Sequence, residues 1–254
     1  MNVVVLVKYV PDPLGTPTLG EDLLVVREGT DGTLDPGDEH AVEAGLQAVE
    51  AQGGEVTLVS MGPEVAMTAI RKALSMGAHR GVLVTDPALR GADTLATAKV
   101  LAATIARQPF DLVLSGVEST DGYTGTLPMT VAELLGLPSL TFARRIELGE
   151  GAVRIERQTD LGYDMLETPL PALVTVTGAA NEPRYATLKG IMSAKTKPVE
   201  QLGLGDLGLN APDVAPSQHV VAVTDVPARG AGDVIEGDDA VARVADLLAE
   251  SKVI

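Results

Sequence analysis

Val3-Val4-Val5-Leu6-Val7 is an uninterrupted run of apolar, mostly β-branched residues, and it decides the fold class of this 254-residue chain. A strand that is apolar at every position has both of its faces covered, as in a parallel sheet that lies between two layers of helices. The run therefore predicts a buried parallel strand near the start of the chain.

The patterns that follow this run alternate between strand and helix. Continuous apolar runs predict further strands at residues 55–60, 81–85 and 111–116. Helical spacing, with Pro63 at a helix start and Gly77 at a helix end, predicts helices at residues 38–51, 63–77, 94–107 and 129–135. Strand alternating with helix predicts an α/β fold with a right-handed, doubly wound, mostly parallel sheet.

Beyond Pro138 the rhythm changes. Residues 140–148, 152–159 and 165–177 have strand patterns joined by short turns, which predicts added antiparallel strands. Residues 202–216 have neither periodicity and suggest an extended arm. Residues 238–251 predict a closing helix with an apolar stripe, which could lie on another subunit or on the chain's own core; the stripe consists of Val241, Val244, Leu247 and Leu248.

Composition narrows the class of protein. The chain has no cysteine, which rules out disulfides and thiolate metal sites and fits a reducing compartment. Its formal net charge of −16 disfavours binding to nucleic acid or to anionic lipid. The longest apolar runs, residues 3–7 and 170–176, are too short to span a bilayer. These features predict a cytoplasmic protein with no membrane insertion.

Three loops follow predicted strands, at residues 8–13, 60–63 and 115–126. Ligands of doubly wound sheets bind beyond the carboxyl ends of the strands. The third loop is rich in glycine and hydroxyl residues and leads into a helix at Thr124-Gly125-Thr126, so free N–H groups and the helix dipole favour a phosphate there. A glycine-rich turn with a threonine cap explains the same residues equally well. The chain has neither a Walker lysine motif nor G-x-G-x-x-G.

Other polar residues indicate no reaction centre. His40, His79 and His219 are scattered, without the spacing of metal ligands. Glu39, Glu43 and Glu50 resemble an ordinary solvated helix face. No nucleophile elbow is present. The sequence therefore predicts neither a hydrolytic centre nor a metal site.

The most distinctive stretch is Asn-Glu-Pro-Arg-Tyr-Ala-Thr-Leu at residues 181–188, followed by Lys-Gly-Ile-Met at 189–192. Pro183 biases Glu182 away from helical geometry and so predicts a turn. Thr187 can cap a short helix that carries Leu188, Ile191 and Met192 on one side. These three side chains could form an exposed docking surface or belong to the core.

The octapeptide at 181–188 closely resembles the signature of the electron transfer flavoprotein β subunit. Four other segments are also similar to that family. They are Val-Lys-Tyr-Val-Pro-Asp at 7–12, residues 35–44, Ala-Leu-Ser-Met-Gly-Ala-His-Arg-Gly at 73–81, and residues 111–116. The segments occur in order, so the resemblance covers nearly the whole chain.

The resemblance implies an electron carrier subunit, not an enzyme, with a Rossmann-like fold of the adenine nucleotide α-hydrolase type. Such a subunit forms a heterodimer with an α subunit, which holds most of a redox-active FAD. Electrons arrive from acyl-CoA dehydrogenases of fatty acid β-oxidation and related enzymes, and leave toward a membrane quinone oxidoreductase. The β subunit itself binds a structural AMP. The expected division is a nucleotide-binding domain at 1–197 and an arm and helix at 198–254 that contact the α subunit.

The resemblance also assigns residues. It implies AMP contacts from Leu6, Asp35, Pro36, Gly37, Asp38, Met61, Gly116, Ser119, Asp121, Gly122, Tyr123, Thr124, Gly125 and Thr126. It implies a recognition loop near 184–197 that docks dehydrogenases, with contacts from Arg184, Tyr185, Leu188, Ile191 and Met192.

The chain departs from the family pattern at two positions. Thr126 stands where relatives usually have a long amide donor, which leaves the identity of the nucleotide open. Gln158 stands where the family often has an acid directed at the α subunit, so that contact would be neutral. The alternatives are an electron-bifurcating variant with a second FAD and NADH reactivity, and a free-standing nucleotide-binding α/β module that forms homodimers.

Overall fold

The structure is a computed structural model that describes residues 1–27, 29–224, 226–227, 230, 232 and 234–254. The chain divides into two compact units, Met1–Val221 and Ala222–Ile254, and each is described by itself.

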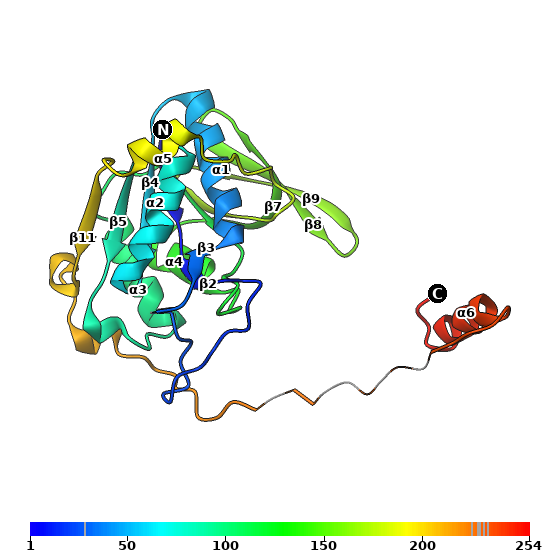
Figure 1. The fold of residues 1–254 in the computed structure, drawn as a ribbon. Helices are drawn as coiled ribbons and strands as arrows, with labels where there is room; N and C mark the ends of the chain where they lie inside the picture. The colour runs from blue at the N-terminus through cyan, green and yellow to red at the C-terminus, as the bar shows by residue number, and fades with distance from the viewer. Residues whose placement is uncertain (28, 225, 228–229, 231, 233) are drawn as a thin grey trace. The chain divides into compact units, whose positions relative to one another are not determined.

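The first unit is built on a nine-stranded sheet with the strand order β11-β5-β4-β1-β6-β10-β7-β8-β9 (Figure 1). β8 and β9 run antiparallel to their neighbours, whereas the other strands pair in parallel. This arrangement confirms the predicted fold class. In chain order the strands are β1 Asn2–Leu6, β4 Glu55–Met61, β5 Arg80–Val84, β6 Leu112–Gly116, β7 Ser139–Leu148, β8 Ala152–Thr159, β9 Gly162–Pro169, β10 Ala172–Val176 and β11 Val199–Leu202.

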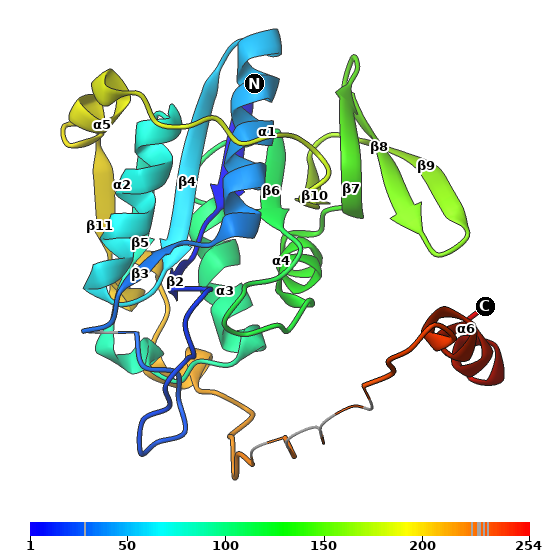
Figure 2. The same ribbon diagram turned by 45° about the vertical axis from the view of Figure 1, so that its right-hand side comes forward.

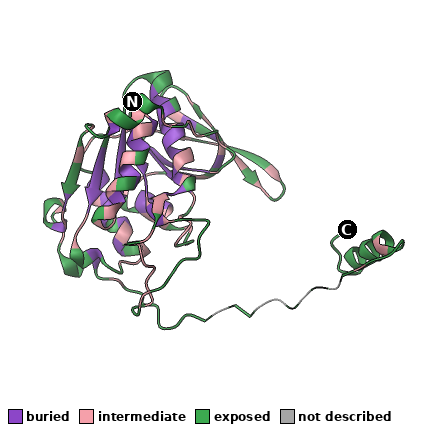
Figure 3. Ribbon diagram, in the orientation of Figure 1, coloured by how far each residue is buried: buried purple, intermediate pink, exposed green. Residues whose placement is uncertain are grey.

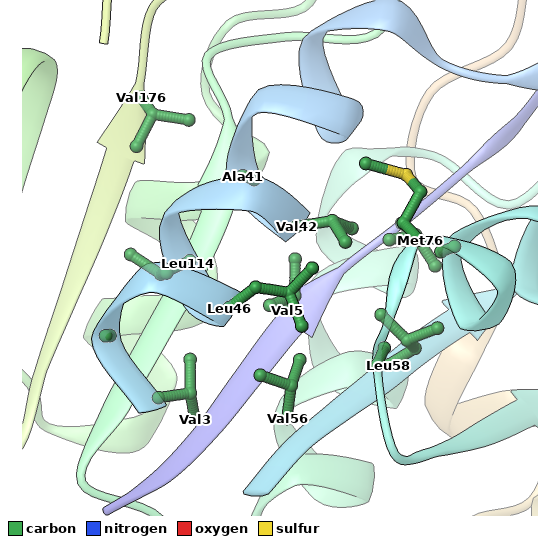
Figure 4. Packing of buried hydrophobic residues seen from close by; sticks show 14 of the residues in the cluster. Val3, Val5, Ala41, Val42, Leu46, Val56, Leu58, Met76, Leu114 and Val176 are labelled. Carbon is green, nitrogen blue, oxygen red and sulfur yellow. The ribbon is translucent and has the colours of Figure 1, made fainter. Parts of the chain in front are cut away.

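Helices cover both faces of the sheet (Figure 2). Val3 and Val5 of β1 belong to a cluster that includes α1 (Pro36–Gln52) and α2 (Met67–Met76), drawn in Figure 4. Val4 and Leu6 point to the opposite cluster, which includes α3 (Thr94–Ile105) and α4 (Leu127–Leu135). This alternation of side chains is the reason that every position of the opening run is apolar.

The strand predicted at 165–177 is instead two strands, and this expectation was wrong in part. Pro169 and Pro171 have no N–H to donate to a ladder, so the chain leaves the antiparallel pair there. β10 then enters the parallel sheet between β6 and β7.

The segment predicted as an extended arm at 202–216 instead belongs to the first unit and packs against β5 and α3. β11 extends the sheet beside β5, and the short 3-10 helices η3 (Leu204–Leu207) and η4 (Ala211–Val214) follow it against α3. Two apolar anchors, Leu204 and Val214, are buried, which is the physical reason for this packing. Of the arm expected at 198–254, residues 225, 228–229, 231 and 233 lie outside the described residues.

The second unit contains the predicted closing helix, α6 (Ala240–Glu250). No residue of α6 is buried, and its apolar stripe is exposed along its length (Figure 3). The stripe consists of Val241, Val244, Leu247 and Leu248.

The order of strands reverses at β1. From β1 the chain builds outward through β4 and β5, and then returns to place β6 on the other side of β1. Such a switch point leaves a crevice at the carboxyl ends of the two central strands, where ligands of this fold class bind. A two-stranded sheet of β2 (Tyr9–Pro11) and β3 (Gly32–Leu34), absent from the sequence expectations, follows β1 at this end.

Candidate functional site

A buried carboxylate joins the ends of the two central strands. Asp38, in the first turn of α1, accepts the backbone N–H of Lys8 at 2.8 Å and that of Gly116 at 3.3 Å. Lys8 follows β1 and Gly116 ends β6, so this one side chain spans the switch point of the sheet. The backbone of Gly37 also lies close to the end of β6, since a Cβ atom at Gly37 would lie 3.9 Å from the Cα atom of Gly116.

A second carboxylate, that of Asp35, ties the loop after β6 to the start of α1. Its Oδ1 accepts the N–H of Gly37 at 2.8 Å and so caps the helix that Pro36 begins. Its Oδ2 accepts the N–H and the hydroxyl of Thr120, at 2.7 and 2.8 Å. Asp35 is fully buried, and these bonds satisfy it.

The third carboxylate, Asp121, lies between two cations. Lys8 Nζ donates to Asp121 Oδ1 at 2.6 Å and to Ser119 Oγ at 3.1 Å. Arg27 donates to Asp121 Oδ2 through Nε at 2.9 Å and Nη2 at 2.5 Å. The Asp121 side chain is only 3% exposed. Sequence reasoning missed Arg27, because it lies in an irregular loop without a motif.

The pKa values of Asp38 and Asp121 are shifted in opposite directions. Burial, and next the nearby Asp35, raise the pKa of Asp38 well above its usual value. Burial would also raise the pKa of Asp121, but Lys8 and Arg27 outweigh it and the pKa of Asp121 is lowered. Asp121 is therefore held as a carboxylate by its two cationic partners.

The loop from Gly122 to Thr126 follows this charged cluster directly and is largely exposed. Tyr123 and Gly125 have φ of 47° and 61°, so the backbone turns sharply at both residues. Thr126 precedes α4, yet its side chain makes no capping hydrogen bond. Among the described residues, the N–H groups of Thr124, Gly125 and Thr126 have no protein acceptor. A bound anion could accept hydrogen bonds from N–H groups placed in this way.

The remaining expected nucleotide contacts lie apart from this hydrogen-bonded set. Leu6 ends β1 and is buried in the cluster beneath α3 and α4. Met61 ends β4, is half-buried and packs against the same cluster. The structure thus brings together the residues of the loops at 35–38 and 116–126, while Leu6 and Met61 form the neighbouring strand ends.

The distinctive stretch at 181–188 is fixed to α1. Asn181 Nδ2 donates to the carbonyl oxygen of His40 at 3.0 Å, and His40 Nδ1 lies 3.0 Å from the carbonyl oxygen of Asn181. Arg184 donates through Nε to Glu43 at 2.7 Å and through Nη1 to Glu50 at 2.6 Å. The side chain of Glu43 is 5% exposed. The expectation that Glu43 is part of a solvated helix face was therefore wrong.

This ion pair shifts the titration of its members. Burial would raise the pKa of Glu43, but the hydrogen bonds from Arg184 lower it overall. Hydrogen bonds from Arg184 likewise lower the pKa of Glu50. The guanidinium of Arg184 is thus engaged inside the chain.

The side chains that follow Arg184 are exposed. Thr187 caps α5 (Leu188–Ala194), as predicted, by accepting the N–H of Gly190 at 3.0 Å. The exposed fractions are 97% for Tyr185, 76% for Leu188, 48% for Ile191 and 66% for Met192. We call these four residues the α5 patch. The alternative that Leu188, Ile191 and Met192 belong to the core was wrong.

Two further properties concern the described residues only. None of their helices combines the length and the apolar character that a bilayer crossing requires. No three histidine, aspartate or glutamate side chains among them are grouped as ligands of a metal ion.

Comparison with known proteins identifies the family. Residues 22–207 match the family described as "Electron transfer flavoprotein domain". The chain is 43% identical over 249 residues to the electron transfer flavoprotein subunit beta of Mycobacterium leprae, covering 93% of this chain and 94% of the relative. The corresponding subunit of Mycobacterium tuberculosis is 41% identical over 242 residues, which cover 91% of each chain.

A third relative has a more specific name. The caffeyl-CoA reductase-Etf complex subunit CarD of Acetobacterium woodii is 36% identical over 246 residues, covering 93% of this chain and 92% of the relative. The family match at residues 22–207 covers the loops at 35–38 and 116–126 as well as the α5 patch. The chain therefore belongs to the electron transfer flavoprotein β-subunit family and is an electron carrier subunit, not an enzyme.

Proposed function

We propose that this chain is the β subunit of a heterodimeric electron transfer flavoprotein that works in the cytoplasm. It passes electrons from acyl-CoA dehydrogenases of fatty acid β-oxidation and related enzymes, through the FAD of the heterodimer, to a membrane quinone oxidoreductase. The observation that carries the proposal is the α5 patch. Four apolar side chains are exposed on a segment that is fixed to α1, in a chain of this family.

The α5 patch suits a protein partner better than solvent. Leucine, isoleucine, methionine and tyrosine side chains can fill an apolar pocket and serve as a binding hot spot. Arg184 lies beside them, but its hydrogen bonds to Glu43 and Glu50 give it a supporting role. In our proposal Leu188 is the main contact with dehydrogenases, and Arg184 fixes the base of the recognition loop.

The loops at the switch point suit an AMP. The exposed N–H groups of residues 124–126 and the start of α4 can hold the phosphate, and glycines at 122 and 125 let it approach the backbone. Asp35, Asp38 and Asp121 hold these loops in place. Leu6 and Met61 are the apolar strand ends beside them. The FAD, held mainly by the α subunit, supplies the electron-carrying chemistry.

The second unit is the proposed contact with the α subunit. α6 has an apolar stripe that nothing within its own unit buries. An unburied stripe on an amphipathic helix is typical of a surface that is covered in a complex.

Co-expression with the α subunit tests this function. We expect a yellow complex with one copy of each chain, one FAD and one adenine nucleotide, with the nucleotide found by chromatography of the denatured supernatant. Two flavins per complex together with NADH oxidation would favour the bifurcating variant. The similarity of the chain to CarD is the reason to test for this alternative. A colourless homodimer would contradict the proposal and favour a free-standing nucleotide-binding module.

A further inference from the structure

The α5 helix is joined to α2 by two cations, each of which caps the other helix. Arg71, on α2, donates through Nη1 to the carbonyl oxygens of Ala194 and Lys197, both at 2.7 Å. These carbonyls lie at and just beyond the end of α5. A guanidinium here satisfies acceptors that the last turn of a helix leaves open, and it complements the helix dipole.

Lys197 makes the reverse connection. Its ammonium donates to the carbonyl oxygens of Leu74, Gly77 and Ala78, at 2.9, 3.3 and 2.6 Å. These carbonyls end α2 and lead toward β5. All three ammonium donors are thus matched by three acceptors. Lys197 is half-buried, and burial lowers its pKa.

The backbones of the two helices also approach closely. A Cβ atom at Gly190 would overlap the carbonyl oxygen of Ser75, so only glycine fits at this crossing. Ala194 is buried beneath the end of α5. The helix is thereby fixed at its middle and at its end, while Leu188, Ile191 and Met192 point away from the core.

We propose that Arg71 and Lys197 are positioning residues for dehydrogenase docking, which hold α5 in the orientation that presents Leu188, Ile191 and Met192 to the partner. This inference rests on the proposed docking function of the α5 patch. Its physical basis is the length of α5: a helix of 7 residues has too few internal hydrogen bonds to persist without anchors.

An ordered patch binds more tightly than a mobile one. Docking onto a frayed segment would first have to order the backbone and the side chains of the segment, and this conformational entropy would be subtracted from the affinity. The two anchors order the segment before the partner arrives. They act on affinity, and within the described part of the chain none of their hydrogen bonds reaches the switch-point loops.

The test uses the purified αβ complex, with its concentration varied in the reduction assay of an acyl-CoA dehydrogenase. Lys197→Met removes the ammonium but keeps the length of the side chain, and Arg71→Met removes the second anchor. Lys99→Met is the matched control, because Lys99 is exposed on α3, outside the recognition loop, and its ammonium donates to the backbone carbonyl oxygen of Asp213. Leu188→Ala measures docking itself.

We expect Lys197→Met and Arg71→Met each to raise the apparent KM for the complex about 10-fold, since a charge-assisted hydrogen-bond set is lost. The kcat at saturation and the nucleotide content should stay unchanged. Leu188→Ala should also raise KM, whereas Lys99→Met should not. Amide hydrogen exchange at residues 188–194 should accelerate in Lys197→Met and Arg71→Met but not in Leu188→Ala.

The outcomes separate the two proposals. If Leu188→Ala raises KM but Lys197→Met and Arg71→Met do not, docking at α5 stands and the positioning role is overturned. If none of the three changes KM, docking at α5 is overturned, and the positioning role with it. Equal effects of Lys99→Met and Lys197→Met would assign the change to the lost positive charge and would also overturn the positioning role.

Discussion

At the scale of single residues, neighbours in the stretch 181–188 have different tasks. Asn181 and Arg184 face inward and bond to α1, whereas Tyr185 and Leu188 face solvent. The sequence motif therefore combines an anchor with the surface that it presents. Arg184 is the central anchor, because it neutralises Glu43, which is almost fully buried.

Removing this anchor should destabilise the protein. Arg184→Met leaves the carboxylate of Glu43 buried without its cation, and we expect a loss of about 1–3 kcal/mol in the free energy of unfolding. Arg154→Met is the control: Arg154 pairs with Glu167 on the surface, with 52% of each side chain exposed, and should lose less than about 1 kcal/mol. Urea unfolding followed by circular dichroism gives both values, and equal losses would contradict the buried-pair argument.

At the scale of elements, Asp93 connects α3 to the last part of the first unit. It caps α3 through the N–H of Ala96 at 2.9 Å. Its other oxygen accepts the N–H and hydroxyl of Ser217, both at 2.7 Å, and the N–H of Gln218 at 3.2 Å. The backbone hydrogen bond from Ala96 is the largest cause that lowers the pKa of Asp93 to about 2, with further lowering by the bonds from Ser217 and Gln218.

This connection should open in acid. Because the folded pKa is lowered, the contribution of Asp93 to stability is complete above the ordinary value of 3.8 and is lost as the pH falls through about 2. We expect the amide protection factors of Ser217 and Gln218 to fall over this window. Asp93→Asn should remove most of that pH dependence while keeping a helix cap, since asparagine caps as well as aspartate. An unchanged pH profile in the variant would show that Asp93 is not the responsible group.

The elements that could be predicted from the sequence are those with a long, regular pattern. β1, α1, β4 and β6 occur at the expected positions, because each buries a continuous apolar run or stripe. β11 was missed because it is a short edge strand with polar residues at its centre, Glu200 and Gln201. The division between β9 and β10 depends on prolines within an otherwise apolar run.

The candidate site could likewise be predicted from the sequence only in part. Its loops were expected because they follow strands, but its internal contacts were not. Asp121 meets Lys8 and Arg27 across 113 and 94 positions of the chain. Contacts of this range leave no local pattern, since they arise only when the sheet brings distant loops together. The assignment of Asp35 and Asp38 came from the family resemblance, and their role as ties between loops came from the geometry.

At the scale of the first unit, the two proposed sites lie at opposite ends of the sheet. The switch-point loops are at the carboxyl ends of β1 and β6, beside β2 and β3. α5 contacts the end of α2 that leads into the start of β5, and both ribbon views draw it in the upper part of the first unit, as they do the N-terminus (Figures 1 and 2). Changes at one end should therefore leave the other unaffected.

Arg27 offers a test of this separation. Arg27→Met removes one of the two cations that hold Asp121, so the loop at 116–126 should loosen and release adenine nucleotide about 10-fold faster. The KM for a dehydrogenase should not change. Arg90→Met is the matched control, because Arg90 pairs with Asp22, which lies in the same loop as Arg27, and not with Asp121. Nucleotide release is measured by chromatography after dilution, and wild-type retention in Arg27→Met would exclude a role for this cation.

The exposure of Tyr185 in the α5 patch makes this side chain a spectroscopic probe of the patch. The chain contains no tryptophan and four tyrosines. Tyr9 lies in the core, Tyr123 in the loop before α4, Tyr163 on β9 and Tyr185 in the α5 patch. Fluorotyrosine incorporated throughout the chain would therefore give one fluorine resonance for each of four separate regions. Titration with a nucleotide, an α subunit or a dehydrogenase would then reveal which region each of them touches, without any engineered label.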